Sequence, residues 1–323
     1  MLPIQSEEST RLSGTPLSPA LFACPIDKSP LGDGYCCSQC GFAFPVVRGV
    51  PVLVNDQNSV FRISDYQNEE AAYAGASGYA GHADRRTGLR QIYRQLMHHL
   101  SEAPMVGRDF DVHDAVLHIQ QVLPGARILI IGAGDTSLAG NVIYTDVAFG
   151  KNVACIADAH DLPFANESFD ACIAVAVLEH VVDPQRCVAE IQRILKPGGF
   201  VFAETPFLQP VHMRAYDFTR FTHLGHRRLF RFFDEFRSGM AGGPAMTFSL
   251  ALRYGLIAMS DGPTAKKVLR LLGLLVTYPV RYLDLVAKRQ MAAYDSASGF
   301  YFFGTLRTSA IPDRDILKEF RGA

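Results

Sequence analysis

The sequence has almost no excess of charge of either sign. Its 31 lysine and arginine residues are balanced by 32 aspartate and glutamate residues, which gives a formal net charge of −1. Proteins that hold nucleic acid by its phosphates carry a strong basic excess or a basic stripe. The composition therefore predicts no nucleic-acid partner.

The first residues lack the features of a secretory signal. The segment MLPIQSEEST has no basic start and no apolar run, and a signal peptide needs both. We therefore expect a cytoplasmic protein.

The cysteines lack the regular spacing of a disulfide-rich domain. Four of the seven lie between Cys24 and Cys40, and the other three stand in apolar segments. We expect Cys155, Cys172 and Cys187 to be small residues of the core.

The most informative stretch runs from Arg127 to Glu204. The apolar run Ile128–Ile131 leads directly into Gly132, Ala133 and Gly134. Such a run is typical of a strand that is buried on both faces and ends in a tight turn. Glycine in that turn lets the backbone approach a ligand closely.

Apolar runs typical of strands and helices continue to alternate up to the end of this stretch. Further strands are predicted at 141–147, which ends near Asp146, at about 153–157, at 171–175 and at 200–205, and a helix capped by Asp183 at 184–195. The alternation at 298–307 predicts an antiparallel last strand. The fold class is therefore α/β, with a doubly wound, Rossmann-like and mostly parallel sheet that binds ligands at the carboxyl ends of its strands.

These blocks resemble the class I S-adenosylmethionine (SAM)-dependent methyltransferases, in particular methyltransferase type 11. The resemblance rests on LIIGAG, Asp146, ADAHDLPFANESFDACIAVAVLEHV and EIQRILKPGGFVFAETP, in this order. It implies SAM as the cofactor. By resemblance, the cofactor-binding residues are Gly132, Ala133 and Gly134 at the amino acid end, Asp146 at the ribose, Asp158 and Ala159 at the adenine, and Val175 and Ala176 at the pocket floor.

One spacing departs from this pattern. Asp146 follows Gly132 after only 14 positions, whereas a complete strand–turn–helix–strand unit places its acidic residue about 20 positions on. The first crossover must therefore be a loop or a single turn. This resembles a subset of methyltransferases in bacterial polysaccharide and lipopolysaccharide biosynthesis, which implies an oxygen or nitrogen of a small molecule or saccharide as the methyl acceptor.

Two other classes of protein remain open at this stage. A nicotinamide-binding oxidoreductase shares the glycine turn and the acidic strand end, although the blocks after Asp158 argue against it. A non-catalytic, methyltransferase-like interaction protein is the other alternative, because the short crossover leaves room for a degenerate pocket.

A second motif lies near the start of the chain. Cys37-Ser-Gln-Cys40 is a two-thiol knuckle, and Cys24-Pro-Ile-Asp27 repeats its spacing with a carboxylate in the second position. Two knuckles predict a zinc ribbon with Cys24, Asp27, Cys37 and Cys40 as ligands and Cys36 as a spare thiol. The following FPVVRGVPVL resembles the zinc-ribbon protein that activates tRNA and release-factor methyltransferases. A ribbon that has lost its metal is the alternative.

The segment after the fifth strand, 206–233, should border the acceptor pocket. Its polar residues include His212, Asp217 and Arg220. His212 and Asp217 are suited to orient or deprotonate an acceptor hydroxyl, and Arg220 to bind an anionic group. The alternative is an Asp217–Arg220 ion pair, three positions apart in a lid helix, with His212 a bystander.

The remaining segments complete the predicted domain organisation. The apolar helix at 268–286 carries too many charges to span a membrane; it is either a core or dimer helix, or it rests on a membrane and meets a lipid-linked sugar. The isolated histidines His98, His99, His113 and His118 are expected at the surface. The predicted units are a disordered leader 1–19, a zinc-ribbon-like β module 20–56, a helical connector 57–125, the methyltransferase domain 126–310 with a helical insertion 244–290, and a tail 311–323.

Overall fold

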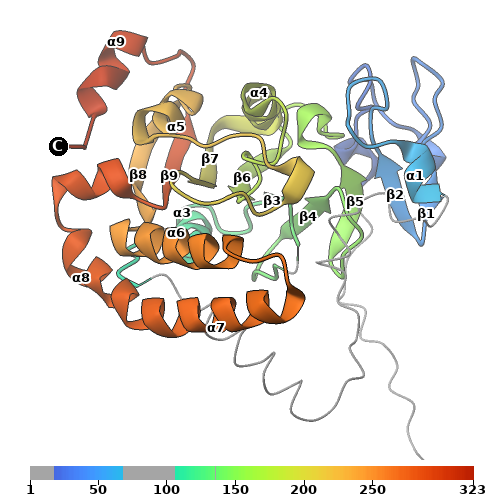
Figure 1. Cartoon of the computed structure of the whole chain (residues 1–323). Helices are drawn as coiled ribbons and strands as arrows, with labels where there is room; N and C mark the ends of the chain where they lie inside the picture. Colours follow the sequence, from blue (N-terminus) through green and yellow to red (C-terminus); the bar gives the residue numbers. More distant parts are fainter. Residues whose placement is uncertain (1–17, 68–105, 135) are drawn as a thin grey trace, which may run out of the picture.

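The computed structural model describes residues 18–67, 106–134 and 136–323 (Figure 1). Within these residues a nine-stranded sheet forms the centre of the molecule, in the order β1-β2-β5-β4-β3-β6-β7-β9-β8. The predicted leader lies almost wholly outside the described residues, as does the segment that contains His98 and His99.

The strands confirm the predicted fold class. Neighbouring strands from β2 to β7 run parallel, whereas β9 pairs antiparallel with both β7 and β8. The central strand β3 is buried along its whole length, as its apolar run predicts. The strands are β1 (Val46–Val47), β2 (Val50–Leu53), β3 (Ile128–Ile131), β4 (Val142–Asp146), β5 (Val153–Ala157), β6 (Phe169–Val175), β7 (Leu195–Pro206), β8 (Phe233–Gly242) and β9 (Gly299–Leu306).

Two strand starts differ from the sequence prediction. β6 begins at Phe169 and β7 at Leu195, because these two residues pair with each other before the glycine-containing turn. The segment from Lys196 to Gly199 therefore belongs to an irregular beginning of β7 and does not only end the preceding helix.

Helices cover both faces of the sheet (Figure 1). In this view α4 and α5 lie above the sheet, and α3, α6 and α7 lie below it. The Asp183 side chain caps α4 by accepting from the Arg186 amide, as predicted. The helices are α1 (Ile63–Gln67), α3 (Val112–Val122), α4 (Pro184–Ile194), α5 (His223–Leu229), α6 (Pro244–Ala258), α7 (Pro263–Val280), α8 (Asp284–Ala287) and α9 (Asp313–Ile316).

The N-terminal cysteine segment shares its core with the sheet. Strand β2 extends the main sheet by pairing Val52 with Ile156 of β5. The ring of Phe22 stacks on Phe164 with centroids 5.7 Å apart, and Lys28 Nζ lies 2.8 Å from a carboxylate oxygen of Glu190 on α4. The segment is thus joined to the sheet by backbone pairing, aromatic packing and an ion pair.

The connection between β3 and β4 is a loop. The described residues between Gly132 and Asn141 contain no helix, in agreement with the short spacing. The Leu138 amide donates to the Tyr144 hydroxyl at 2.8 Å, and the same hydroxyl donates to the Leu138 carbonyl at 3.1 Å. A side chain of β4 therefore holds the loop in place where a crossover helix would otherwise pack.

Helix α7 packs on α6 through one face and exposes the other. Gly273, Leu274 and Thr277 are buried, with Gly273 close to Arg253 of α6, whereas a stripe of large apolar residues on the outer face is solvent-exposed. No helix in the described part of the chain is both long enough and apolar enough to cross a membrane. The exposed stripe consists of Val268, Leu272, Leu275 and Val276.

Candidate functional site

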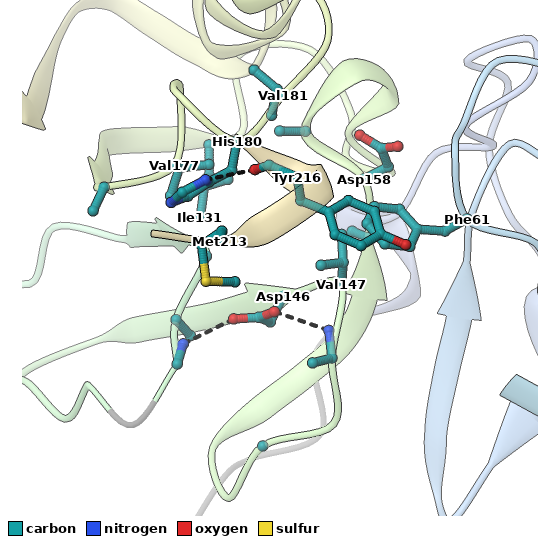
Figure 2. Close-up of a pocket in the computed structure, with 18 of the residues that line it drawn as sticks. Phe61, Ile131, Asp146, Val147, Asp158, Val177, His180, Val181, Met213 and Tyr216 are labelled. Carbon is teal, nitrogen blue, oxygen red and sulfur yellow. Dashed lines mark hydrogen bonds between the residues drawn. The ribbon is translucent and has the colours of Figure 1, made fainter. Parts of the chain in front are cut away.

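A cavity of about 500 Å³ opens at the carboxyl ends of β3, β4, β5 and β6 (Figure 2). This is the edge at which a doubly wound sheet binds its ligand. Every residue assigned to the cofactor from the sequence lines this cavity: Gly132, Ala133, Gly134, Asp146, Asp158, Ala159, Val175 and Ala176.

The glycine turn after β3 needs glycine for two separate reasons. Gly132 has a φ of +68°, a conformation that L side chains rarely adopt. A Cβ built on Gly132 would also lie 2.4 Å from Cγ2 of Val177, whereas a Cβ on Gly134 would meet nothing within 4 Å. The backbone at Gly132 therefore packs so closely against Val177, which follows β6, that no side chain fits between them.

Asp146, at the end of β4, ties two loops of the cavity together. Its carboxylate accepts from the Gly134 amide at 2.8 Å and from the Ala148 amide at 2.9 Å (Figure 2). Burial raises the pKa of this carboxyl, while the amides favour its ionised form. An ionised carboxylate has about four acceptor positions, so Asp146 keeps capacity for two ribose hydroxyls.

Asp158, after β5, is held by neighbours on both oxygens. One oxygen lies 2.6 Å from His160 Nδ1, and the other accepts from the Ser59 hydroxyl at 2.5 Å. Burial raises the pKa of Asp158, but its bonds with His160 and Ser59 leave it below the usual value. Ser59 belongs to the N-terminal segment, which thereby reaches the cavity.

The same N-terminal segment supplies one wall of the cavity, which the sequence analysis missed. Phe61 stacks on Tyr216 with ring centroids 5.7 Å apart and planes 9° from parallel (Figure 2). The Tyr66 hydroxyl donates to the Val147 carbonyl at 2.7 Å. Two aromatic residues in a polar connector carry no spacing rule, so only the folded structure reveals their place beside the cavity.

The backbone of Ala176 is strained at the cavity floor. Its φ is +52°, although it has a Cβ, and its amide donates to the Glu204 carbonyl at 3.0 Å. Strained residues of this kind cluster at ligand-binding positions, where the surrounding structure holds them.

The three residues predicted on the acceptor side form one connected group. His212 lines the cavity, whereas Asp217 and Arg220 stand behind it. Asp217 accepts from the His212 amide at 2.9 Å and from Arg220 Nη2 at 2.7 Å. Although burial raises the pKa of Asp217, the Arg220 guanidinium and the His212 amide lower it to about 2. The Asp217–Arg220 ion pair of the alternative prediction is present, but residues 217–222 form no helix. Asp217 contacts the cavity lining through its bond with the His212 amide.

Glu179 and His180 join this group and were not singled out from the sequence. Both follow β6 in the segment VLEHV, where they were counted only as part of a family block. The Glu179 side chain is fully buried, and burial raises its pKa to about 8. Nε2 of His180 lies 3.0 Å from Nε2 of His212, and its Nδ1 lies 2.7 Å from the Tyr216 carbonyl.

The four predicted zinc ligands lie together in the N-terminal segment. The sulfurs of Cys24 and Cys40 are 3.8 Å apart, and the Cys37 sulfur is 3.4 Å and 3.5 Å from the two Asp27 oxygens. With zinc–sulfur distances of about 2.3 Å and zinc–oxygen distances of about 2.0 Å, a tetrahedron needs separations of about 3.8 Å and 3.5 Å. The donor set therefore fits zinc. The Cys36 sulfur instead faces the Gly41 carbonyl at 3.8 Å.

The mostly parallel sheet with an antiparallel last strand and the cavity at the carboxyl ends of its strands agree with the Rossmann-like fold expected from the sequence. Residues 141–203 match a family model described as a methyltransferase domain. The matched residues lie within the stretch whose sequence blocks predicted a methyltransferase.

Several relatives and several solved structures that the chain resembles are named as methyltransferases. The chain is 38% identical over 91 residues to a ubiquinone/menaquinone biosynthesis C-methyltransferase, UbiE, of Saccharophagus degradans, which is 27% of this chain and 32% of the relative. It is 43% identical over 65 residues to a demethylmenaquinone methyltransferase of Clavibacter sepedonicus, which is 19% of this chain and 26% of the relative. The chain thus spans about a third of these relatives or less.

Among solved structures, the similarity extends over more of the chain at lower identity. Phosphoethanolamine N-methyltransferase 2 of Haemonchus contortus, in complex with S-adenosyl-L-methionine, is 14% identical. The alignment covers 66% of this chain and 56% of that one, with a TM-score of 0.39.

Proposed function

We propose that this chain is a SAM-dependent methyltransferase with a small-molecule acceptor. The observation that carries the proposal is the cavity at the carboxyl ends of the parallel strands, which the glycine turn and Asp146 enter from neighbouring strands. The match of residues 141–203 to a methyltransferase-domain model supports the same conclusion.

The chemistry requires positioning more than acid–base strength. A lone pair of the acceptor attacks the methyl carbon in line with the sulfonium, and the carbon–sulfur electron pair stays on sulfur as S-adenosylhomocysteine (SAH) forms. The glycine turn and Asp146 would hold the cofactor, while the 206–222 loop with His212 would orient the acceptor and exclude water. The acceptor gives up its proton to a base or to solvent in the same transfer.

The acceptor side of the proposal is independent of the cofactor side. The family match ends at residue 203, before the loop that contains His212, so it gives no information on the class of methyl acceptor. The short first crossover favours an oxygen or nitrogen of a saccharide, whereas the names of the relatives favour a carbon of a quinone precursor. Mass analysis of products from both acceptor classes distinguishes these two candidates.

We further propose that the outer face of α7 rests on a membrane surface. Val268, Leu272, Leu275 and Val276 recur at the spacing of one helix face and are exposed, with Lys266, Lys267 and Arg270 nearby. Such a face suits an acceptor with a lipid tail. Sedimentation with anionic phospholipid vesicles tests this contact, and a stable dimer that ignores vesicles would assign the stripe to a second copy of the chain.

The cofactor proposal predicts the behaviour of Asp146→Ala. Loss of the carboxylate removes its bonds to the Gly134 and Ala148 amides as well as its bonds to the ribose. SAH affinity should fall by about 1–3 kcal/mol, which is the cost of a lost charged hydrogen bond. Calorimetric titration with SAH measures this change.

The wild-type protein serves as the reference in the same experiment. A thermal shift with SAH and none with NAD would support a methyltransferase over an oxidoreductase. Unchanged SAH affinity in Asp146→Ala would mean that the ribose binds elsewhere. Stoichiometric SAH binding without turnover of any acceptor would favour the non-catalytic alternative.

The cysteine cluster predicts a structural zinc ion. Elemental analysis should find about one zinc per chain at this cluster, lost in Cys37→Ser and in Cys40→Ser, because a tetrahedral site needs all four ligands. Cys36→Ser is the matched control and should keep the metal, since its sulfur faces the Gly41 carbonyl. A fully folded protein whose zinc content is the same in all these variants would contradict the site.

A further inference from the structure

A second group of metal-ligating side chains lies at the wall of the cavity. One ligand atom each from Glu179, His180 and His212 lie within 4.8 Å of one another. The Glu179 Oε1 atom is 3.6 Å from Nε2 of His180 and 3.9 Å from Nε2 of His212. Both histidines line the cavity, so this group borders the space for ligands.

The Nδ1 atoms of both histidines face oxygen acceptors, which places the proton of each neutral ring on Nδ1. Nδ1 of His180 lies 2.7 Å from the Tyr216 carbonyl, to which it must donate. Nδ1 of His212 lies 3.4 Å from the Pro210 carbonyl, its hydrogen-bond partner, and 3.4 Å from an Asp217 oxygen. Arg220 holds that carboxylate. A carbonyl or carboxylate on one ring nitrogen is the arrangement that orients metal-binding histidines.

The Nε2 atoms of His180 and His212 then face each other, 3.0 Å apart, each with a lone pair. With both Nδ1 atoms protonated, the neutral rings have no proton to share between these two nitrogens. Two nitrogens about 2.1 Å from one metal ion, at right angles to each other, would also be about 3.0 Å apart.

The buried carboxyl group of Glu179, beside the two rings, has no hydrogen-bond partner among the described residues. Neither oxygen of Glu179 finds a hydrogen bond within the described part of the chain, and the side chain is fully buried. Burial of a carboxyl group costs considerable free energy unless the group is hydrogen-bonded, paired with an opposite charge or bound to a metal. Its terminal torsion is broad and allows the oxygens to approach the rings.

We propose that Glu179, His180 and His212 bind a divalent transition-metal ion at the wall of the cavity. Two imidazoles and one carboxylate suit zinc, iron(II) or manganese and leave coordination positions open. The open positions face the cavity. Metal binding does not depend on the proposed function, whereas the use of the ion to hold an acceptor oxygen rests on it.

The test compares metal content among the full-length wild type, Glu179→Gln and His212→Ala. Each protein is stripped with a chelator, dialysed against Zn²⁺ and, separately, Mn²⁺, and measured by elemental analysis. Mn²⁺ prefers oxygen and nitrogen ligands to thiolates, so it separates this group from the cysteine cluster. His113→Ala is the matched control, because its side chain on α3 is 70% exposed and lies outside the cavity.

The wild type and His113→Ala should hold one more equivalent of metal than Glu179→Gln and His212→Ala. Asp217→Asn should keep the ligands but weaken binding by about 10–100-fold, as the loss of a group that orients a ligand does. Equal metal content in the wild type, Glu179→Gln and His212→Ala would overturn the site. SAH affinity, measured on the same samples, tests the cofactor proposal separately; since Glu179→Gln is nearly isosteric and His212 is partly exposed, both variants should still bind SAH.

Discussion

Replacement of Gly132 by valine is expected to abolish measurable SAH binding. The new Cβ would lie 2.4 Å from Cγ2 of Val177, and the backbone would have to keep a φ of +68°. Left-handed backbone costs about 1–2 kcal/mol for a residue with a Cβ, and overpacking adds about 1–3 kcal/mol. The turn should therefore move into the cavity and carry the Gly134 amide away from Asp146.

Gly125→Val is the matched control for this experiment. Gly125 has a φ of +80°, but a Cβ there meets nothing within 4 Å, and it does not line the cavity. The control should lose a similar amount of stability from backbone strain and bind SAH normally. If calorimetry finds normal SAH binding in a folded Gly132→Val, the cofactor does not pass under this turn.

The second large effect is expected at His212. His212→Ala should lower turnover by about 10²–10⁴-fold, the contribution of a positioned acid–base or orienting group. SAH affinity should change little, because the proposed cofactor contacts are made by other residues of the cavity lining, among them Gly132 and Asp146. The measurement is single-turnover methyl transfer with an acceptor that the wild type uses, beside SAH calorimetry.

Asp217→Asn extends this prediction to the residue behind His212. The asparagine side chain has nearly the shape of aspartate but lacks the charge that pairs with Arg220. Because His212 itself is retained, turnover should fall less than in His212→Ala. His113→Ala should retain wild-type turnover and serves as the control. Wild-type rates in both His212→Ala and Asp217→Asn would mean that the 206–222 loop only covers the site.

The meeting of the residues assigned to the cofactor in one cavity could be predicted because its determinants are local. The apolar run of β3, the glycine turn and the acidic end of β4 follow one another in the sequence, and the fold brings strand ends to one edge. The short crossover could also be predicted, since too few residues separate Gly132 from Asp146 for a helix.

The rest of the cavity depends on contacts between distant segments. Phe61 reaches Tyr216 only because β2 joins the main sheet beside β5, and nothing in the residues of β2 specifies that neighbour. His180 and His212 meet across 32 positions, after two separate strands. For Asp217 and Arg220 the sequence left two alternatives open, a role toward the acceptor and an ion pair with each other. The structure contains the ion pair, and the Asp217 side chain in it is only 1% exposed.

The pairing of β2 with β5 has a consequence for how the chain could be divided. A fragment that lacks the first 54 residues would uncover the backbone donors and acceptors of β5 beside Ile156 and Ala157. An uncovered strand of this kind is a template for edge-to-edge pairing and aggregation. Among the residues that the structure describes, the outermost strand on this side is β1, which has only two residues, too short to pair with another molecule over more than one or two positions. The cysteine segment thus protects the sheet from self-association through its backbone pairing, with or without a metal.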